Sequence, residues 1–239
     1  MFVGFLVPCI LGMALASAMA QNTPVVPTTA EEIAEYNRNA HEVRTQSGLF
    51  FREEWKRIPG PIERPVSQQN VAGTNLELKL YGPSAKEVLF NGGTDVANNP
   101  PHLWTGMCTQ TCAVALRDRN NFIDLSGFGK VHWYIKVSGL HRIHPIIKLA
   151  DGSWWLGERG DGDVFDFHPA EFTLAEVRWI KLDIDKVVTV GRLVDQLDLS
   201  RVDEIGFTDL MPGSGHGDGG YTDVGWIEVY GRPVPRNGR

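Results

Sequence analysis

Histidine, tyrosine, arginine and lysine side chains alternate with apolar residues along 122–149, FIDLSGFGKVHWYIKVSGLHRIHPIIKL. In 131–137 and in 143–149 the apolar residues fall at every second position, so in β-strands they share one face. The Ser138-Gly139 pair between the two runs predicts a tight turn. We therefore expect a hairpin with one face in the core and a polar opposite face.

The runs 177–184 and 224–230 show the same alternation and are expected to join this sheet. Aromatic rings stack on the apolar faces of sugars, and Lys and Arg bind hydroxyls or carboxylates. An ordinary solvated face also carries Lys, Arg and Tyr, but several Trp, Tyr and His together favour ligand binding. The predicted polar face consists of His132, Tyr134, Lys136, Arg142, His144, Lys148, Trp179, Lys181, Asp183, Trp226, Glu228 and Tyr230, with His216 of the glycine-rich run 213–221 as a cover over it.

The same face could carry an enzyme. Arg142 or Lys148 would neutralise a uronate while Tyr134 or His144 removes its C5 proton, as β-elimination requires. Hydrolysis of a glycoside would instead need two carboxylates across one cleft. A metal site shared by His141 and His144 is disfavoured, because in a strand these two residues point to opposite faces.

Three acids in an apparent glycine-rich loop, Asp161, Asp163 and Asp166, could wrap a structural Ca²⁺. The twelve-residue calcium-loop pattern is absent, so a plain acidic surface loop is the favoured interpretation and Ca²⁺ is the alternative. No other cofactor is expected.

Residues 1–20 have the apolar run and the Ala18-Met19-Ala20 ending of a secretory signal peptide, although a basic n-region is missing. We expect export to the periplasm or medium, a mature start at Gln21, and no membrane span after cleavage. In an oxidising compartment Cys108 and Cys112 of CTQTC are expected to form a disulfide. The net charge of -6 and the lack of a dense Lys/Arg run argue against a nucleic-acid partner.

Many short alternating runs separated by turn residues predict an all-β fold, a two-sheet antiparallel β-sandwich of the jelly-roll type with a short N-terminal surface helix. The expected organisation is a signal peptide at 1–20, a linker and short helix at 21–48, a β-sandwich domain at 49–231 and a loose tail at 232–239.

Three stretches, IDLSGFGKVHWYIKV, LDLSRVDEIGF and GWIEVYG, carry a family resemblance. Together the chain resembles the galactose-binding-like jelly-roll domains, including carbohydrate-binding modules of the family-11 type. The resemblance implies a jelly roll of about eight to ten strands, often with a structural calcium and a sugar-binding concave sheet. Carbohydrate recognition is thus the first expectation, a lyase or hydrolase of sugars the second, and a structural or interaction module without a small ligand the third.

Overall fold

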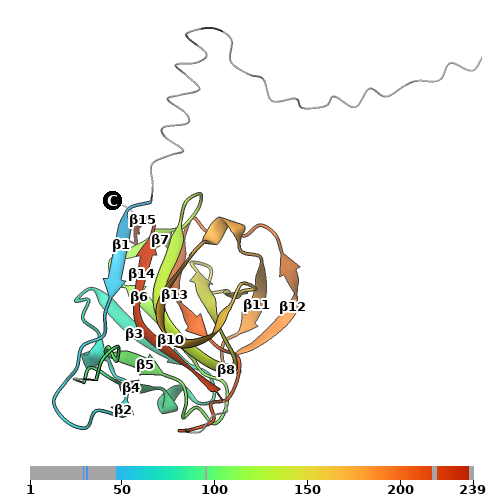
Figure 1. The fold of residues 1–239 in the computed structure, drawn as a ribbon. Helices are drawn as coiled ribbons and strands as arrows, with labels where there is room; N and C mark the ends of the chain where they lie inside the picture. Colours follow the sequence, from blue (N-terminus) through green and yellow to red (C-terminus); the bar gives the residue numbers. More distant parts are fainter. Residues whose placement is uncertain (1–28, 30, 32–46, 95, 217–219, 237–239) are drawn as a thin grey trace, which may run out of the picture. The chain divides into compact units, whose positions relative to one another are not determined.

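The computed structural model describes residues 29, 31, 47–94, 96–216 and 220–236 (Figure 1). The predicted signal peptide, and the predicted linker and helix up to residue 46 apart from Thr29 and Glu31, lie outside the described residues. In the described part of the chain, no helix has the length and apolar character needed to span a membrane.

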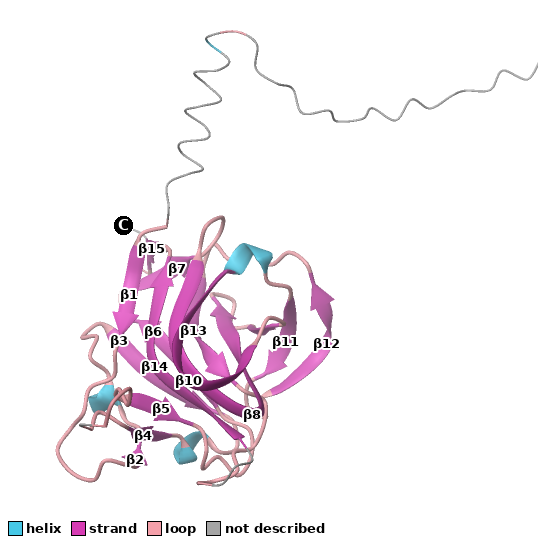
Figure 2. Ribbon diagram, in the orientation of Figure 1, coloured by secondary structure: helices cyan, strands magenta, loops and turns pink. Residues whose placement is uncertain are grey.

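The described chain folds into antiparallel β-strands that form two sheets, here called sheet A and sheet B (Figures 1 and 2). Sheet A contains β1 (Leu49–Glu53), β2 (Arg64–Pro65), β4 (Leu89–Asn91), β5 (His102–Trp104), β10 (Asp161–Thr173) and β14 (Gly220–Tyr230). Sheet B contains β3 (Leu76–Tyr81), β6 (Ala113–Asp118), β7 (Asn121–Asp124), β9 (Trp154–Gly157), β11 (Trp179–Asp183), β12 (Val188–Val194), β13 (Val202–Thr208) and β15 (Arg232–Pro235). Three short 3-10 helices, η1 (Gln68–Asn70), η2 (Ala85–Glu87) and η3 (Leu174–Glu176), connect them. The all-β fold class predicted from the sequence is confirmed.

One strand, β8 (Lys130–Leu149), runs through both sheets. Its first part pairs with β14 and β10 in sheet A, and its second part pairs with β13 and β9 in sheet B. The hairpin predicted for this stretch is therefore wrong. Gly139 does adopt a positive φ of 70°, but neighbouring strands supply the backbone partners on each side, so the chain continues into the second sheet instead of reversing.

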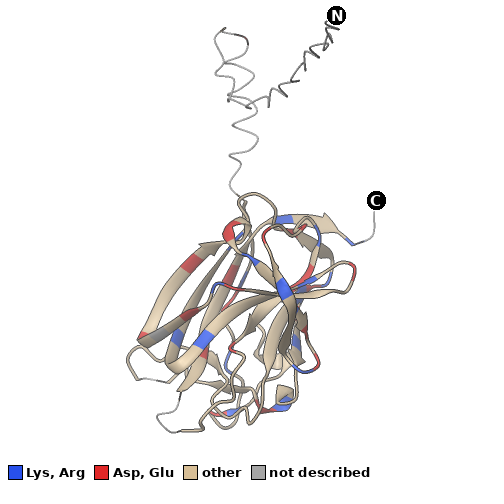
Figure 3. Cartoon of the chain, turned by 90° about the vertical axis from the view of Figure 1, so that its right-hand side faces the viewer, with Lys and Arg blue, Asp and Glu red and all other residues tan. Residues whose placement is uncertain are grey.

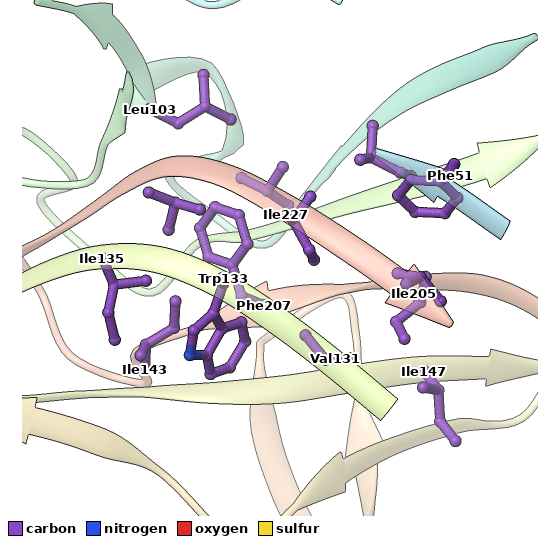
Figure 4. Packing of buried hydrophobic residues seen from close by; sticks show 14 of the residues in the cluster. Phe51, Leu103, Val131, Trp133, Ile135, Ile143, Ile147, Ile205, Phe207 and Ile227 are labelled. Carbon is purple, nitrogen blue, oxygen red and sulfur yellow. The ribbon is translucent and has the colours of Figure 1, made fainter. Parts of the chain in front are cut away.

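The main core lies between the two sheets and receives side chains from both (Figure 4). Trp133 of β8 is fully buried, packs against Phe172 of β10 at 5.0 Å between ring centroids, and donates its indole N–H to Asp161 Oδ2 at 3.0 Å. Phe207 of sheet B and Ile227 of sheet A fill the same cluster. The apolar side of the alternation was predicted correctly for β8 and β14.

A second, smaller apolar cluster contains Ile146, Trp154 and Leu182, all from sheet B. Strand β11 therefore buries apolar side chains on both of its faces. Leu182 belongs to the second cluster, and Trp179, 1% exposed, points into the main core. The prediction that Trp179 lies on a ligand-binding face is wrong for this reason.

Two segments predicted as irregular are strands. The acidic run that starts at Glu158 enters β10 at Asp161, where it pairs with Ile143 of β8. The predicted loose tail forms β15 beside β7, and Arg232 holds it there through an ion pair with Asp124 at 2.6 Å. Strand pairing in both cases depends on partners far away in the sequence.

Cys108 and Cys112 are free thiols in the main core, 0% and 1% exposed. The predicted disulfide is not formed in this structure, and the two sulfur atoms pack as apolar core atoms. A hydrogen bond with Cys108 and burial raise the pKa of the Cys112 thiol well above its ordinary value. Pairing in an oxidising compartment remains a prediction.

Candidate functional site

A cavity of about 460 Å³ opens on the outer face of sheet A. Its floor is formed by outward side chains of β5, β14 and β8, and its walls by the segment 96–99, by Phe167 of β10 and by His216. This volume lies in the range of small-molecule sites. The cavity is therefore the first place to look for binding chemistry.

Strand register explains why polar groups meet on this floor. Asp223 of β14 lies opposite Lys136 of β8 on one side and opposite Trp104 of β5 on the other. Directly opposed residues in antiparallel strands project to the same face. Lys136, Asp223 and Trp104 thus form one row across three strands, although 87 positions in the sequence separate Lys136 from Asp223.

Asp223 is 4% exposed, and no described residue donates a hydrogen bond to its Oδ1 atom. The ionisable group beside it is the His102 ring, whose Nε2 atom lies 3.6 Å from Oδ1. Burial raises the pKa of Asp223 to about 8, although the Lys136 charge opposes the shift. At neutral pH this side chain is a carboxylic acid that has an O–H to donate.

His102, 5% exposed, forms the other half of this pair. Its Nδ1 atom lies 2.8 Å from the Pro100 carbonyl oxygen, and burial lowers the pKa of the ring to about 4. Gly92, at φ +75°, makes this contact sterically feasible, because a Cβ atom there would lie 2.1 Å from Pro100 O and 2.5 Å from His102 Nδ1. The imidazole is therefore neutral and fixed in orientation.

Lys136, Tyr221, Trp104 and His216 complete the polar and aromatic lining. The Lys136 ammonium lies 5.3 Å from the Tyr221 ring centroid. Burial lowers the pKa of Lys136, but the Tyr221 hydroxyl and the nearby Asp223 and Asp166 outweigh this effect, so the pKa is raised overall. The His216 ring lies 4.9 Å from that of Trp104. His216, predicted as a cover, does line the cavity.

Beside the cavity, three aromatic rings and one guanidinium form a row across sheet A, here called the aromatic row. Phe167 of β10 stacks on Tyr134 of β8 at 5.3 Å, and Tyr134 stacks on Trp226 of β14 at 5.6 Å and 8°. Arg52 of β1 lies 4.5 Å from the Trp226 centroid. Because β14 lies between β8 and β1, Tyr134 and Arg52 approach Trp226 from opposite sides.

The aromatic row corrects one expectation about sugar binding. Each inner ring has neighbours against both of its faces, so Tyr134 and Trp226 offer ring edges and not open faces to a ligand. Phe167 connects the row to the cavity, because its other contact is the His102 ring at 5.3 Å. The Tyr134 hydroxyl points toward the cavity wall and donates to Asn98 Oδ1 at 2.9 Å.

Glu228 is the centre of a fully paired group at the far end of the row. It accepts hydrogen bonds from Tyr230 at 2.9 Å and contacts His132 Nδ1 at 3.1 Å, and it forms an ion pair with Arg52. Burial raises the pKa of Glu228, but these partners outweigh it and lower the pKa overall. Glu228 is therefore already occupied by Arg52, Tyr230 and His132.

The structure separates the residues predicted as catalytic. Tyr134 lies in sheet A, whereas His144 lies in the sheet B part of β8 and contacts Gly157 O through Nδ1 at 3.0 Å. Arg142 is exposed in the crossing between the two sheets, opposite Gly162 of β10. Because β8 crosses between the sheets, Tyr134, His144 and Arg142 do not form one site.

Two predicted ligand-binding lysines also lie in sheet B. Lys148 forms ion pairs with Glu204 at 2.9 Å and Asp203 at 3.4 Å. Lys181 is exposed, 5.8 Å from the Trp155 ring centroid. Neither lines the cavity.

The predicted calcium ligands are divided among other partners. Asp161 accepts from the Trp133 indole, and Asp166 accepts from the Asn98 amide. Asp163 lies in β10 between them, and its side chain is outside the described set. Within the described ranges, no group of three or more His, Cys, Asp or Glu side chains gathers closely enough to hold a metal ion.

His102, Trp104 and Asp223 are the site residues that sequence reasoning missed. His102 and Trp104 sit in a three-residue strand among turn residues, which gives no periodic signal. Asp223 had a usable signal, because it alternates with Tyr221 and precedes the closing strand run. Its neighbours on the other strands could be identified only from the strand register in the structure.

Searches for related proteins found no matching family model and no matching curated protein. Among solved structures, a family 11 carbohydrate-binding module of a Clostridium thermocellum cellulosomal cellulase is 16% identical, with 71% of this chain and 95% of that chain covered and a TM-score of 0.40. An exo-β-agarase structure is 13% identical over 70% of this chain and 24% of its own, with a TM-score of 0.37. The similarity of this chain to family-11-type modules concerns the fold alone.

Proposed function

We propose that this chain binds a carbohydrate, or a ligand with similar hydroxyl chemistry, in the cavity on the outer face of sheet A. The observation that supports this most is the buried Asp223 Oδ1 atom, which lies 3.6 Å from His102 Nε2 and has no hydrogen-bond partner within the described residues. Buried polar groups are normally satisfied, and those that are not await a ligand or water. The Lys136 ammonium and the Tyr221 hydroxyl add further donors.

The rings around the cavity suit a ligand that carries both polar and apolar faces. The rings of His216 and Phe167 line the walls, while Trp104 and the hydroxyl-binding groups occupy the floor. Sugars present C–H faces and hydroxyl edges in this combination. The mixed lining is less suited to a purely apolar ligand, which would leave Asp223 and Lys136 desolvated.

The test is a binding panel measured by calorimetry, with mixed-linked β-1,3-1,4-glucan, agar oligosaccharides and mucin O-glycans as probes. Lys136→Met should weaken binding by about tenfold or more, because hydrogen bonds to a charged group contribute about 1.5–3 kcal/mol. Lys181→Met, the matched control on sheet B, should leave affinity unchanged. Absence of binding by the wild-type protein, or equal effects of the two variants, contradicts the proposal.

A carbohydrate-active enzyme, a lyase or a hydrolase, is the second candidate, favoured by one observation. A buried acid that is protonated near neutral pH is the state of a general acid, and Asp223 lines the cavity in that state. Turnover would appear as new unsaturated ends by absorbance, or as new reducing ends. Asp223→Ala should abolish either signal, and a retained signal would remove Asp223 from the mechanism.

We further propose that the protein is exported, on the basis of the signal-like residues 1–20. Expression of the chain with residues 1–20 retained, followed by N-terminal sequencing of the protein outside the cytoplasm, should give Gln21 as the first residue. An uncleaved chain in the cytoplasm would contradict export.

A further inference from the structure

The hydrogen bond at Nδ1 determines the tautomer of His102. A backbone carbonyl oxygen only accepts hydrogen bonds, so the 2.8 Å contact with Pro100 O requires the proton to be on Nδ1. In the neutral ring, Nε2 then carries a lone pair and no proton. This bare nitrogen is the atom that faces Asp223.

Two acceptors would therefore face each other if Asp223 were ionised. Asp223 Oδ1 and His102 Nε2 are 3.6 Å apart, and both residues are at least 95% covered. A carboxylate oxygen with no donor in such a place bears the full cost of desolvation. A protonated Asp223 removes the charge and supplies the donor that the pair lacks.

We propose that the facing atoms Asp223 Oδ1 and His102 Nε2 carry one proton, held by Asp223, and form a subsite for a neutral ligand hydroxyl, which accepts from Asp223 and donates to His102 Nε2. This inference rests on the proposed function and specifies the ligand group that the site recognises. An oxygen at hydrogen-bonding distance from both atoms fits over a 3.6 Å separation. The hydroxyl then satisfies both buried groups at once.

The other charged and titratable groups around the pair favour a hydroxyl over an ammonium. Lys136 faces Asp223 from β8, Tyr221 comes from β14, Asp166 from β10, and His216 from the segment before β14. The Lys136 charge repels a second cation beside Asp223. An ammonium only donates hydrogen bonds, so it cannot accept one from the Asp223 O–H.

The site excludes an ionised carboxyl group for a related reason. A ligand carboxylate could accept from Asp223 and Lys136, but it has no proton for His102 Nε2. That nitrogen would remain without a hydrogen-bond donor in a largely covered site. A hydroxyl is the small group that both donates and accepts.

The first experiment needs no identified glycan. Carbon-13 NMR of the Asp carboxyl carbons follows the titration of Asp223, whose signal is the one removed by Asp223→Asn and kept by the cavity control Asp166→Asn. In the free protein the Asp223 midpoint should lie near pH 8. A midpoint near the ordinary value of 3.8 overturns the proposal.

The second experiment adds two probes with one carbon frame, ethanol and ethylammonium, in which an ammonium replaces the single hydroxyl of ethanol. A group that binds only protonated Asp223 must raise the apparent midpoint, by linkage. We expect ethanol to raise it measurably and ethylammonium to leave it unchanged. No shift with ethanol, or a downward shift with ethylammonium, overturns the hydroxyl subsite.

A third measurement links the subsite to whichever glycan binds in the panel above. Wild-type affinity should fall by up to about tenfold for each pH unit above about 8, as Asp223 loses its proton. Asp166→Asn should keep this profile, and Asp223→Asn should remove it. A flat wild-type profile overturns the subsite even if the glycan binds, whereas absence of any glycan binding overturns the proposed function and leaves the NMR titrations as an independent result.

Discussion

The two parts of β8 present polar residues to the outer faces of two different sheets, and each face carries a buried acid beside β8 that is paired to a different degree. On sheet B, Glu204 is 1% exposed and accepts from Tyr81 at 2.7 Å and from Lys148 at 2.9 Å. On sheet A, Asp223 is 4% exposed and has no donor among the described residues at Oδ1. Glu204 thus serves structure, as Glu228 does on sheet A, whereas Asp223 remains available.

The ion pairs around Glu204 extend through sheet B. Asp203 next to it binds Arg117 at 3.0 Å and also pairs with Arg236. Figure 3 shows Lys and Arg interspersed with Asp and Glu along the strands. Polar alternation alone therefore does not identify a binding face. The cross-strand partners decide whether a polar residue is already used.

The largest expected effect comes from exchanging each buried acid for its amide. Glu204→Gln should lower the free energy of unfolding by about 3 kcal/mol, because it removes the nearer of the two carboxylates that pair with Lys148 and leaves only Asp203. Asp223→Asn should change it by less than about 1 kcal/mol at pH 6, because one neutral side chain replaces another. Guanidinium unfolding measures both, and equal losses would invalidate the distinction between the faces.

A backbone substitution tests how firmly His102 is held. Gly92→Ala should cost about 2 kcal/mol and disturb the His102 ring signals in nitrogen-15 NMR, because its Cβ would lie 2.1 Å from Pro100 O. Gly152→Ala is the matched control, since Gly152 also has a positive φ, +88°, but a Cβ atom at that position would meet no other atom within 4 Å. If the two variants lose the same stability, the Pro100 contact has no special role.

The pH dependence of stability should carry the signature of the sheet A pair. The raised pKa of Asp223 stabilises the fold below its ordinary 3.8, and this stabilisation is lost as pH rises toward about 8. The lowered pKa of His102 has the opposite effect between 6.5 and about 4.

The two contributions therefore oppose each other below pH 6.5, and only that of Asp223 remains from 6.5 to about 8. In this upper window the free energy of unfolding should fall by up to about 1.4 kcal/mol per pH unit. Thermal or denaturant unfolding across this range, compared with Asp223→Asn, checks the slope. A variant with the wild-type slope would assign the effect to another group.

The smallest effect is expected from Tyr134→Phe in the aromatic row. It removes the exposed hydrogen bond to Asn98 but keeps the stacked ring, so the stability change should stay below about 1 kcal/mol. Glycan affinity should change by no more than about threefold, because the hydroxyl contacts the cavity wall and not the Asp223 pair. A loss of tenfold or more would move the binding site from the cavity to the row.

The sequence was sufficient to predict strands in which apolar residues at alternate positions form a buried face. The alternating run predicted at 224–230 falls within β14, and its Ile227 and Val229 are buried. At both Asp-Leu-Ser corners the Asp carboxylate accepts from the Ser backbone N–H two residues on, Asp124 and Asp198 each at 3.0 Å.

The rest of the fold and the site depended on partners that no local pattern contains. The crossing at Gly139 resembles a hairpin turn until β13 and β9 are seen to pair with the second part of β8. Trp179 alternates like a surface aromatic, but sheet B is apolar on both sides there. Asp223 of β14 and His102 of β5 come together only because these two strands pair. Their spacing in the sequence therefore does not predict the contact.

The position of β14 has a consequence for how the molecule forms. This strand lies between β8 and β1 in sheet A, and the described residues give β1 no other partner. Arg52 and Glu228 meet across 176 positions of the chain, a separation that slows folding because a long loop must close first. During synthesis, strands of sheet B can begin to pair before β14, the central strand of sheet A, has been made. The cavity is therefore among the last features to assemble, and a nascent chain that ends before residue 220 has neither the floor of the site nor a partner for its own first strand.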